Sequence, residues 1–268
     1  MSKRGIAIGD MHCGHLCGLT PPAWQTRKVG KTATKHNKWA TLQRQLWDHY
    51  ERLIDSLGPF DWGMYLGDGI DGKGARSGGT ELITSDTQEQ CEMAVECCNR
   101  VRLRGRRGFE WVGVYGTAYH VGDQEDSENL IAKDAGFKKI GSHEWVDVNG
   151  CVFDLKHSIG SSTIPHGRHT AAAREHLWNQ LWADAKLQPR ASVILRGHVH
   201  YHSYCGGPGW VAMTLPALQG MGTRYGARIC SGIVDWGVTV FDVADDGTFD
   251  WTCETVMIEA QKAKVVTL

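Results

Sequence analysis

Short apolar runs recur along the chain, and a glycine, asparagine or aspartate follows most of them. Runs of this length, rich in Val, Ile and aromatic residues and bounded by turn residues, are typical of buried strands. We therefore predict strands at Gly5–Ile8, Trp62–Leu66, Trp111–Tyr115, Val146–Val148, Cys151–Leu155, Val193–Arg196, Trp210–Thr214, Val238–Val243 and Phe249–Val256. Asn149-Gly150, between the fourth and fifth runs, is the preferred pair for a two-residue hairpin turn.

Longer segments with apolar residues at helical spacing separate several of these strands. We predict helices at Lys38–Leu57, from Thr84 to the region of Arg100, at Glu128–Gly136 and over about residues 168–184. Thr84 or Ser85 is the expected cap of the second helix. The fourth helix carries Leu177, Leu181 and Ala185 on one face, and an amphipathic helix turns such a face toward the core. Strands that alternate with helices predict an α/β fold.

Length and charge add limits to this picture. The chain has 268 residues with 29 Lys and Arg against 30 Asp and Glu, a formal net charge of -1. No linker or charge block divides it, so we predict one domain over residues 1–268. The balanced charge argues against general binding of nucleic acid or an anionic membrane, and any anion site must be local. We find no signal peptide and no bilayer-spanning segment, which predicts a cytoplasmic protein without a membrane partner.

The nine cysteines occur at irregular spacing. An odd number without a regular pattern indicates reduced thiols rather than a disulfide framework. Cys13 and Cys17 could alternatively form a metal-binding pair, although no second cysteine pair completes a zinc site.

Residue types that bind metals follow four of the predicted strands. They are Asp10 and His12 after the first strand, Asp68 after the second, His157 after the strand at 151–155, and His198 and His200 after the strand at 193–196. In an extended chain, side chains two residues apart point to the same face, so Asp10 lies beside His12 and His198 beside His200. Carboxylate and imidazole together suit a divalent transition metal.

Each of these residues alone has an ordinary structural interpretation. Asp10 or Asp68 can cap a turn, and a single histidine can be incidental. Six such coincidences are improbable, because the ends of strands separated by helices gather on one edge of a sheet. The two oxygens of one carboxylate, such as that of Asp68, can also bridge two cations about 3.5–4 Å apart. The pattern therefore predicts a two-metal centre.

Two segments are candidates for contact with a phosphate. Five arginines lie between Arg100 and Arg107, where they either form a solvated cluster at a helix C-terminus or contact a nucleic-acid backbone. Gly160-Ser161-Ser162 precedes a helix that begins near Arg168. This loop is either an anion cradle with Arg168 as a phosphate clamp, or a turn beside a surface cation.

The motif series of the calcineurin-like metallophosphoesterases resembles five segments of this chain, in the same order: Asp10-Met11-His12, Gly67-Asp68, Gly116–His120, His157 and Gly197–His200. Cys13–Pro22 and Gly167-Arg168 resemble the phage and prophage branch of that family. The resemblance implies a four-layer α-β-β-α sandwich with mixed sheets and a metal centre at the carboxyl ends of strands. It also implies a ligand assignment with His157 and His198 on one ion, Asp68 bridging, and the other ion held by Asp10, His12 and His200.

The chain departs from the family at one motif. The family usually has Gly-Asn-His followed by an acid, where Asn binds the second metal and His assists the leaving group. This chain has Gly116-Thr117-Ala118-Tyr119-His120. A Thr hydroxyl is a poorer ligand than an Asn carbonyl, so we expect Thr117 to hold the second metal more weakly. His120 is the candidate general acid from its displaced position.

The function expected from these motifs is hydrolysis of a phosphodiester, of a nucleotide or nucleic acid, by a metal-bridging hydroxide. The chain would need two divalent transition-metal ions, with manganese as first choice and Fe, Zn, Ni or Co as alternatives. Two other functions remain open: a phosphomonoesterase, including a protein phosphatase, and a metal-binding scaffold without catalysis. A phage-encoded enzyme would act in the host cytoplasm. The sequence makes no prediction about the oligomeric state.

Overall fold

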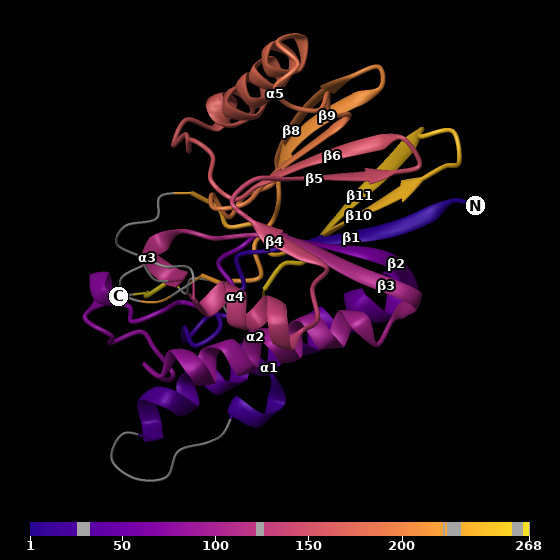
Figure 1. Cartoon of the computed structure of the whole chain (residues 1–268). Helices are drawn as coiled ribbons and strands as arrows, with labels where there is room; N and C mark the ends of the chain where they lie inside the picture. The colour runs from indigo at the N-terminus through magenta and orange to yellow at the C-terminus, as the bar shows by residue number, and fades with distance from the viewer. Residues whose placement is uncertain (26–32, 122–125, 222, 224–231, 259–264, 268) are drawn as a thin grey trace.

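Two mixed β-sheets pack face to face, and helices cover the outer face of each sheet (Figure 1). The predicted α-β-β-α layering with mixed sheets is therefore confirmed. The computed structural model describes residues 1–25, 33–121, 126–221, 223, 232–258 and 265–267. Of residues 33–38, only the backbone is described.

The first sheet has the strand order β11-β10-β1-β2-β3-β4 and the second has the order β5-β6-β7-β9-β8. The strands are β1 (Lys3–Ile8), β2 (Phe60–Tyr65), β3 (Gly105–Val114), β4 (Lys139–Gly141), β5 (Glu144–Val148), β6 (Cys151–Lys156), β7 (Val193–Arg196), β8 (Ser203–Gly207), β9 (Trp210–Thr214), β10 (Gly237–Val243) and β11 (Phe249–Thr255). The helices are α1 (Ala33–Leu57), α2 (Thr87–Arg102), α3 (Ala118–Val121), α4 (Asp126–Asp134) and α5 (Arg168–Asp184). Three single 3-10 turns lie at Pro22–Trp24, Ala75–Ser77 and Pro165–Gly167.

In the first sheet, β1 pairs with β2, β2 with β3 and β3 with β4, all in parallel. Parallel neighbours need crossover connections, and α1 and α2 supply two of them on the outer face of this sheet (Figure 1). The apolar faces of α1 and α2 pack on the sheet through residues such as Leu46, Tyr50 and Met93. The carboxyl ends of β1, β2 and β3 consequently lie at one edge.

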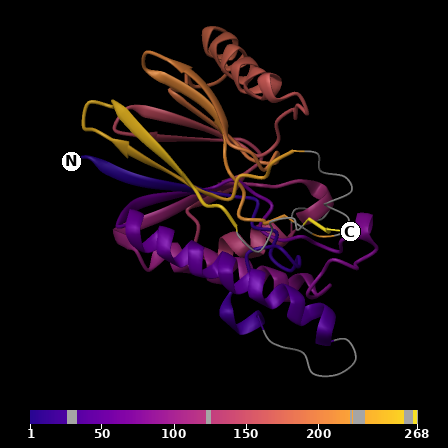
Figure 2. The same cartoon turned by 180° about the vertical axis from the view of Figure 1, so that it is seen from behind.

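In the second sheet, β6, β7 and β9 are parallel, and β5 and β8 flank them antiparallel. The inner faces of the two sheets meet in an apolar core that includes Met64, Phe153 and Phe241. The carboxyl ends of β6 and β7 lie on the same side of the molecule as those of β1 and β2 (Figures 1 and 2). Both sheets therefore deliver the residues that follow these strands to one region.

The Asn149-Gly150 hairpin is confirmed, with β5 and β6 paired antiparallel around it. Asn149 has φ 53° and Gly150 has φ 89°, the positive values that a type I′ turn requires at both central positions. The predicted cap of α2 is wrong. Asp86 is the cap, and its carboxylate accepts hydrogen bonds from the backbone N–H groups of Gln88 and Glu89 at 2.9 and 3.4 Å. A carboxylate at this position accepts hydrogen bonds from the first free N–H groups of the helix, and its negative charge interacts favourably with the positive end of the helix dipole.

The expectation that α5 buries Leu177 and Leu181 is also wrong, because these side chains are 58% and 49% exposed. The helix instead turns Glu175 and Asn179 toward the sheet, where Glu175 pairs with Arg196 and Lys156 at 2.9 and 2.8 Å. Polar contacts to the sheet, rather than an apolar face, thus determine the rotation of this helix about its axis.

Eight of the nine cysteines fall within the described residues, and all eight are free thiols, as predicted. Cys230 lies outside the described residues. The sulfur atoms of Cys13 and Cys97 lie 3.9 Å apart. Among the described residues, Cys13 and Cys17 do not belong to any group that could hold a metal ion. No described helix is long and apolar enough to cross a membrane.

Candidate metal centre

The six residues that sequence analysis selected at strand ends meet where the two sheets converge. They form two groups whose ligand atoms lie within 4.8 Å of one another: Asp10, His12 and His200, and Asp68, His157 and His198. Each group combines residues from both sheets, because Asp10, His12 and Asp68 follow β1 and β2 whereas the other histidines follow β6 and β7. Asp10, His12, Asp68 and His157 are buried.

Five of these residues have a left-handed backbone. Asp10, His12, Asp68, His198 and His200 have φ values of 49°, 45°, 51°, 74° and 55°. Residues other than glycine seldom adopt this left-handed backbone conformation, although Asp and His adopt it more often than most. The strands β1, β2 and β7 therefore end in sharp turns that direct these side chains across the edge of the sheet. Such strain persists where the surrounding structure enforces it, and it clusters at functional sites.

In the first group, nitrogen and oxygen atoms face each other at close range. The Nε2 atom of His200 lies 3.2 Å from Oδ1 of Asp10 and 3.2 Å from Nε2 of His12. The Asp10 carboxylate also accepts the backbone N–H of His198, at 3.1 Å to Oδ1 and 3.0 Å to Oδ2. This N–H comes from the second sheet and fixes the carboxylate of the first sheet in place.

In the second group, His157 has one nitrogen without a hydrogen-bond partner. Its Nδ1 donates to the Leu66 carbonyl at 2.5 Å, because a carbonyl can only accept. Its buried Nε2 lies 3.1 Å from Oδ2 of Asp68 but makes no hydrogen bond within the described structure. In the neutral imidazole this Nε2 carries a lone pair that faces a carboxylate oxygen, an arrangement that a cation between them would stabilise.

Asp71 fixes the orientation of His12 in the first group. Its Oδ1 lies 3.1 Å from Nδ1 of His12, and this contact leaves Nε2 of His12 for the centre. A carboxylate that holds the outer nitrogen of a metal-binding histidine sets its tautomer and raises its basicity. Sequence analysis did not assign Asp71 to the site, although its position three residues after Asp68 in the same strand-end loop was an available signal.

The donor set therefore fits divalent transition metals. Imidazole nitrogens and carboxylate oxygens converge, and the outer nitrogens of His12 and His157 are held by Asp71 and Leu66. A free Nε2 toward the centre and an occupied Nδ1 away from it is the arrangement of metal-binding histidines in proteins. N/O ligands of this kind suit Mn, Fe, Co, Ni or Zn.

Burial and neighbouring charges shift the pKa values of the site residues in different directions. Burial and the charge of His120 lower the pKa of His12 to about 4, so that this ligand is neutral at pH 7. Burial also disfavours the charged form of His157, but Asp68 outweighs it and raises the pKa of His157 to about 9. For Asp68, burial favours the neutral form, and contact with His157 nevertheless holds the pKa below its usual value. The centre thus favours a carboxylate at Asp68 with positive charge beside it.

Thr117 and His120 lie beside the same two groups. The Thr117 backbone N–H donates to Oδ1 of Asp68 at 2.7 Å, and its hydroxyl lies 3.1 Å from the same oxygen. This hydroxyl therefore orients the Asp68 carboxylate, and its role as a metal ligand stays a prediction. Nδ1 of His120 donates to the Asp71 carbonyl at 3.0 Å, and its ring lies 4.5 Å from that of His12, between centroids.

Arg168 contacts Tyr201, which is the residue after His200. Its guanidinium stacks over the Tyr201 ring at 4.4 Å, and its buried Nε has no hydrogen-bond partner within the described structure. Of the preceding loop, Ser162 bonds to Ile164 and Tyr201, as in the turn interpretation. No described contact joins Arg168 to a metal-binding side chain, and its role as a phosphate clamp stays a prediction.

Four of the five arginines near residue 100 bond to other parts of the protein, namely Arg100, Arg102, Arg104 and Arg106. Arg100 pairs with Glu51 and Asp55 at 3.1 and 2.8 Å, and Arg106 pairs with Asp61 at 2.6 Å. These arginines precede or begin the 10-residue strand β3, whose other end leads to Thr117, so roughly 30 Å of strand separates them from the site. This placement favours the structural interpretation of the cluster over contact with a substrate at the centre.

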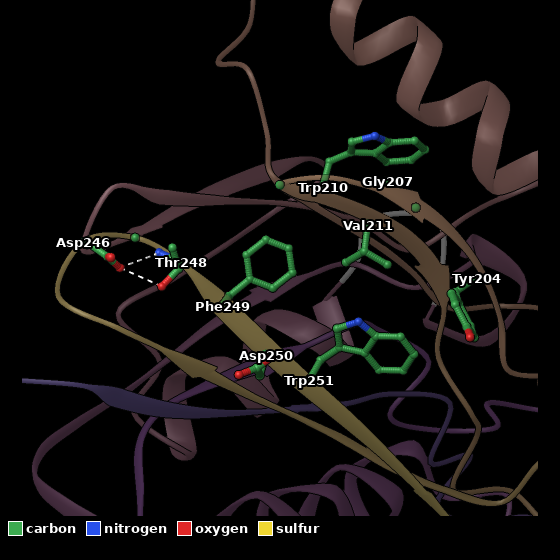
Figure 3. Close-up of a pocket in the computed structure, with 12 residues that line it drawn as sticks. Tyr204, Gly207, Trp210, Val211, Asp246, Thr248, Phe249, Asp250 and Trp251 are labelled. Atoms are coloured by element: carbon green, nitrogen blue, oxygen red, sulfur yellow. Dashed lines mark hydrogen bonds between the residues drawn. The ribbon is translucent and has the colours of Figure 1, made fainter.

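The described structure also contains a hollow of about 590 Å³ that is separate from the centre. Figure 3 shows it between the hairpin of β8 and β9 and the strand β11, lined by Tyr204, Trp210, Phe249 and Trp251. It lies at the amino-terminal end of β11, which is opposite to the carboxyl ends of β1 and β2. None of its lining residues belongs to the two metal-binding groups.

No protein-family model and no curated protein matches this chain. Solved structures similar to it include a novel archaeal phosphodiesterase, with 8% identity, 94% of this chain and 99% of that chain covered, and a TM-score of 0.45. Vps29 from Entamoeba histolytica complexed with zinc has 12% identity, covers 94% and 98%, and has a TM-score of 0.44. A predicted phosphoesterase from Streptococcus pneumoniae has 10% identity, covers 95% and 99%, and has a TM-score of 0.38. The assignment of a function to this chain therefore depends on its own site.

Proposed function

We propose that this chain is a metal-dependent phosphoesterase of the calcineurin-like type that hydrolyses phosphodiester bonds. The observation that carries the proposal is the pair of carboxylate–imidazole groups, in which the buried Nε2 of His157 faces Asp68 without a hydrogen bond. The outer nitrogens of His12 and His157 are already held by Asp71 and Leu66, so the free nitrogens are preorganised for cations.

In this proposal Asp10, His12 and His200 would hold one divalent ion, His157 and His198 would hold a second, and Asp68 would serve both. Two such ions, when bound, lower the pKa of a water and neutralise charge on phosphoryl oxygens. The 3.1 Å contact of Thr117 with Asp68 supports the bridging carboxylate. Manganese is our first choice among the metals that this ligand set admits.

His120 is the proposed general acid. Its Nδ1 is held by the Asp71 carbonyl, so Nε2 is the nitrogen available to protonate the leaving alcohol. Arg168, with an unpaired buried Nε, is the proposed phosphate contact. Because Arg100 and Arg106 are paired with acids and the cluster lies far from the centre, a nucleotide or nucleic-acid substrate would have to be recognised by groups closer to the centre. Membership in the phage and prophage branch stays a prediction from Cys13–Pro22 and Gly167-Arg168.

The decisive experiment is turnover of bis-p-nitrophenyl phosphate and p-nitrophenyl phosphate by the purified protein with manganese. We expect the diester to be the better substrate, and Asp68→Asn to remove activity while the protein stays folded. Asp242→Asn, which changes a partly exposed carboxylate far from the centre, is the matched control. Preference for the monoester would favour a phosphomonoesterase. Absence of turnover with both metals bound would favour the scaffold.

His120→Gln tests the general acid separately. We expect this variant to bind metal like the wild type and to lose the most rate on substrates with poor leaving groups, since only these need a proton in the transition state. Equal losses on all substrates would contradict the acid role. Cyclic dinucleotides, RNA and single- and double-stranded DNA then define the natural substrate class.

A further inference from the structure

The outer face of α5 carries large apolar side chains that no described part of the chain covers. Leu177, Trp178, Leu181 and Trp182 are 58%, 52%, 49% and 42% exposed. In both views α5 is the outermost layer on its side of the second sheet (Figures 1 and 2). A contiguous apolar patch of this kind on a soluble protein usually marks a contact surface.

The inner face of α5 is fixed by specific contacts, so the helix cannot simply rotate to bury these residues. Asn179 accepts the N–H of Ala191 at 2.9 Å and donates to the Pro189 carbonyl at 3.0 Å. Glu175 pairs with Arg196, which is only 2% exposed. A rotation that buried Leu177 would break the Glu175 pair and leave the buried Arg196 with Asp154 as its only ion-pair partner.

Four residues of the outer face have the spacing of a coiled-coil seam. Arg174, Leu177, Leu181 and Asp184 are separated by three, four and three residues. At 3.6 residues per turn, these four side chains fall within an arc of about 80°. Trp178 and Trp182 flank this seam on one side, and the seam is therefore wide enough for a second helix to pack against it.

The seam is complementary to a second copy of itself in the antiparallel orientation. In an antiparallel pair centred at residue 179, position i lies opposite position 358 − i, so that Leu177 meets Leu181 of the other helix. The same register sets Arg174 opposite Asp184. Arg174 has no ion-pair partner among the described residues, and Asp184 bonds Arg190 through Oδ1 alone, which leaves Oδ2 for another cation. Both ends of the seam thus present opposite charges across an apolar centre.

We propose that a second copy of this chain packs on α5, with the two helices antiparallel about a twofold axis near Asn179. A twofold contact of this kind uses the same surface on both copies, as the self-complementary seam requires. Leu177 and Leu181 form its apolar centre, and two Arg174–Asp184 pairs flank that centre. The contact does not depend on the metal centre or on the proposed phosphoesterase activity.

The mass of the full-length protein in solution tests this pairing, measured by sedimentation velocity from about 1 to 100 µM. We expect a dimer for the wild type and a monomer for Leu177→Glu/Leu181→Glu. Leu103→Glu is the matched control, because Leu103 is 79% exposed and follows α2 on the other side of the molecule. All of these side chains are exposed, so circular dichroism should show the same fold for each variant.

Charge reversal tests the antiparallel register. Arg174→Asp alone places two carboxylates opposite each other, and we expect the dimer dissociation constant to rise about tenfold. Arg174→Asp combined with Asp184→Arg restores opposite charges, and the constant should return to within about threefold of the wild-type value. A monomeric wild type over the whole range, or a dimer that survives the double glutamate change, would overturn the proposal. A single reversal without effect would overturn the antiparallel register.

Discussion

Hydrogen bonds to the outer nitrogens decide which nitrogen His12 and His157 turn toward the centre. Asp71 holds Nδ1 of His12 and the Leu66 carbonyl holds Nδ1 of His157. Both residues therefore present Nε2 inward without the rotational freedom of an unrestrained imidazole. Because Asp71 also supports His120 through its carbonyl, this one residue links a candidate metal ligand to the proposed acid.

Asp71→Ala should therefore weaken metal binding although Asp71 is not itself a proposed ligand. Loss of a carboxylate behind a metal-binding histidine typically lowers affinity about 10–100-fold. Titration calorimetry with manganese measures this change. Asp71→Asn, whose amide oxygen can still accept from His12, should retain most of the affinity. Equal affinities for the wild type and Asp71→Ala would contradict a positioning role.

Glu128 is a second buried acid near the centre that sequence analysis did not select. Its Oε1 accepts the Gly69 N–H at 3.2 Å, whereas Oε2 has no hydrogen-bond partner within the described structure. Burial raises the pKa of this carboxyl to about 8, so it is neutral in the metal-free protein at pH 7.

This raised pKa predicts how the stability of the metal-free protein changes with pH. Between the unfolded value of 4.5 and about 8, the folded protein holds a proton that the unfolded chain has lost, so the contribution of Glu128 is fully present below pH 4.5 and declines toward pH 8. Glu128→Gln keeps the acceptor for Gly69 and removes the titration. Relative to the wild type, we expect it to gain on the order of a few kcal/mol in unfolding free energy between pH 5 and 8. Urea unfolding at several pH values measures the difference, and parallel pH profiles for the two proteins would refute it.

At the scale of single elements, the residues at the ends of helices and strands determine where an element begins and where the adjoining side chains point. The carboxylate of Asp86 begins α2 by accepting from two backbone N–H groups. The strands end in left-handed residues that turn ligands across the sheet edge. α5 is attached to its sheet by Glu175, which pairs with Arg196 at 2.9 Å, and by Asn179, which donates to Asp154 at 3.4 Å.

Removal of the α2 cap should cost measurable stability. Asp86→Ala leaves the N–H groups of Gln88 and Glu89 without their acceptor, and we expect a loss of about 1 kcal/mol in unfolding free energy. Asp86→Asn keeps an acceptor oxygen and should lose less than half of that amount. Urea denaturation of the three proteins gives the comparison, and an unchanged Asp86→Ala variant would show that the cap contributes nothing.

The buried and exposed ion pairs should differ strongly when one partner is removed. Asp154→Ala leaves Arg196 with only Glu175 in a site where Arg196 is 2% exposed, and we expect a loss of about 3–5 kcal/mol. Asp242→Ala breaks the partly exposed pair with Arg4 and should cost less than about 1 kcal/mol. Chemical denaturation of both variants tests the contrast. Similar losses would mean that burial does not set the energy of these pairs.

At the scale of the whole molecule, the two sheets share each ligand group. Asp10 and His12 come from the first sheet and His200 from the second, and Asp68 faces His157 and His198 across the same boundary. An ion bound by either group would therefore connect the two sheets. Because each group contains residues from both sheets, unfolding of either sheet would destroy both binding groups.

Metal binding should consequently stabilise the entire fold. At a free metal concentration 100 times the dissociation constant, one site adds about 2.7 kcal/mol, which raises the melting temperature of a chain of this size by about 5–10 °C. Differential scanning calorimetry with manganese and with excess chelator measures the shift. Asp68→Asn should lose most of the shift and Asp242→Asn should keep it. Identical melting temperatures with metal and with chelator would argue against a site of this strength.

Much of the fold followed from local sequence. β-branched and aromatic runs predicted the nine strands of the sequence interpretation, and Asn149-Gly150 predicted the hairpin, because these preferences act within a few residues. The cap of α2 was misplaced by one or two residues, since Thr84, Ser85 and Asp86 all suit that role and only the backbone geometry selects among them. The strands β4 and β8 and the helix α3 were not predicted, because elements of three and four residues carry too little pattern and β8, which ends in Gly206-Gly207, lacks an apolar run.

The sequence by itself determined which side chains are available to a metal centre, because strand ends place Asp10, His12, Asp68, His157, His198 and His200 at one edge of an α/β sheet. Only the tertiary structure decided how they are held, since Asp71, Leu66 and Thr117 contact them across 49 to 91 residues of sequence. It also decided which face of α5 is exposed. The amphipathic pattern predicts a buried Leu177 and Leu181, but the pairing of Arg196 with Glu175 turns the opposite face inward. A long-range ion pair in the interior outweighs a local pattern because the loss of Glu175 as a partner of the buried Arg196 costs more free energy than the exposure of two leucines.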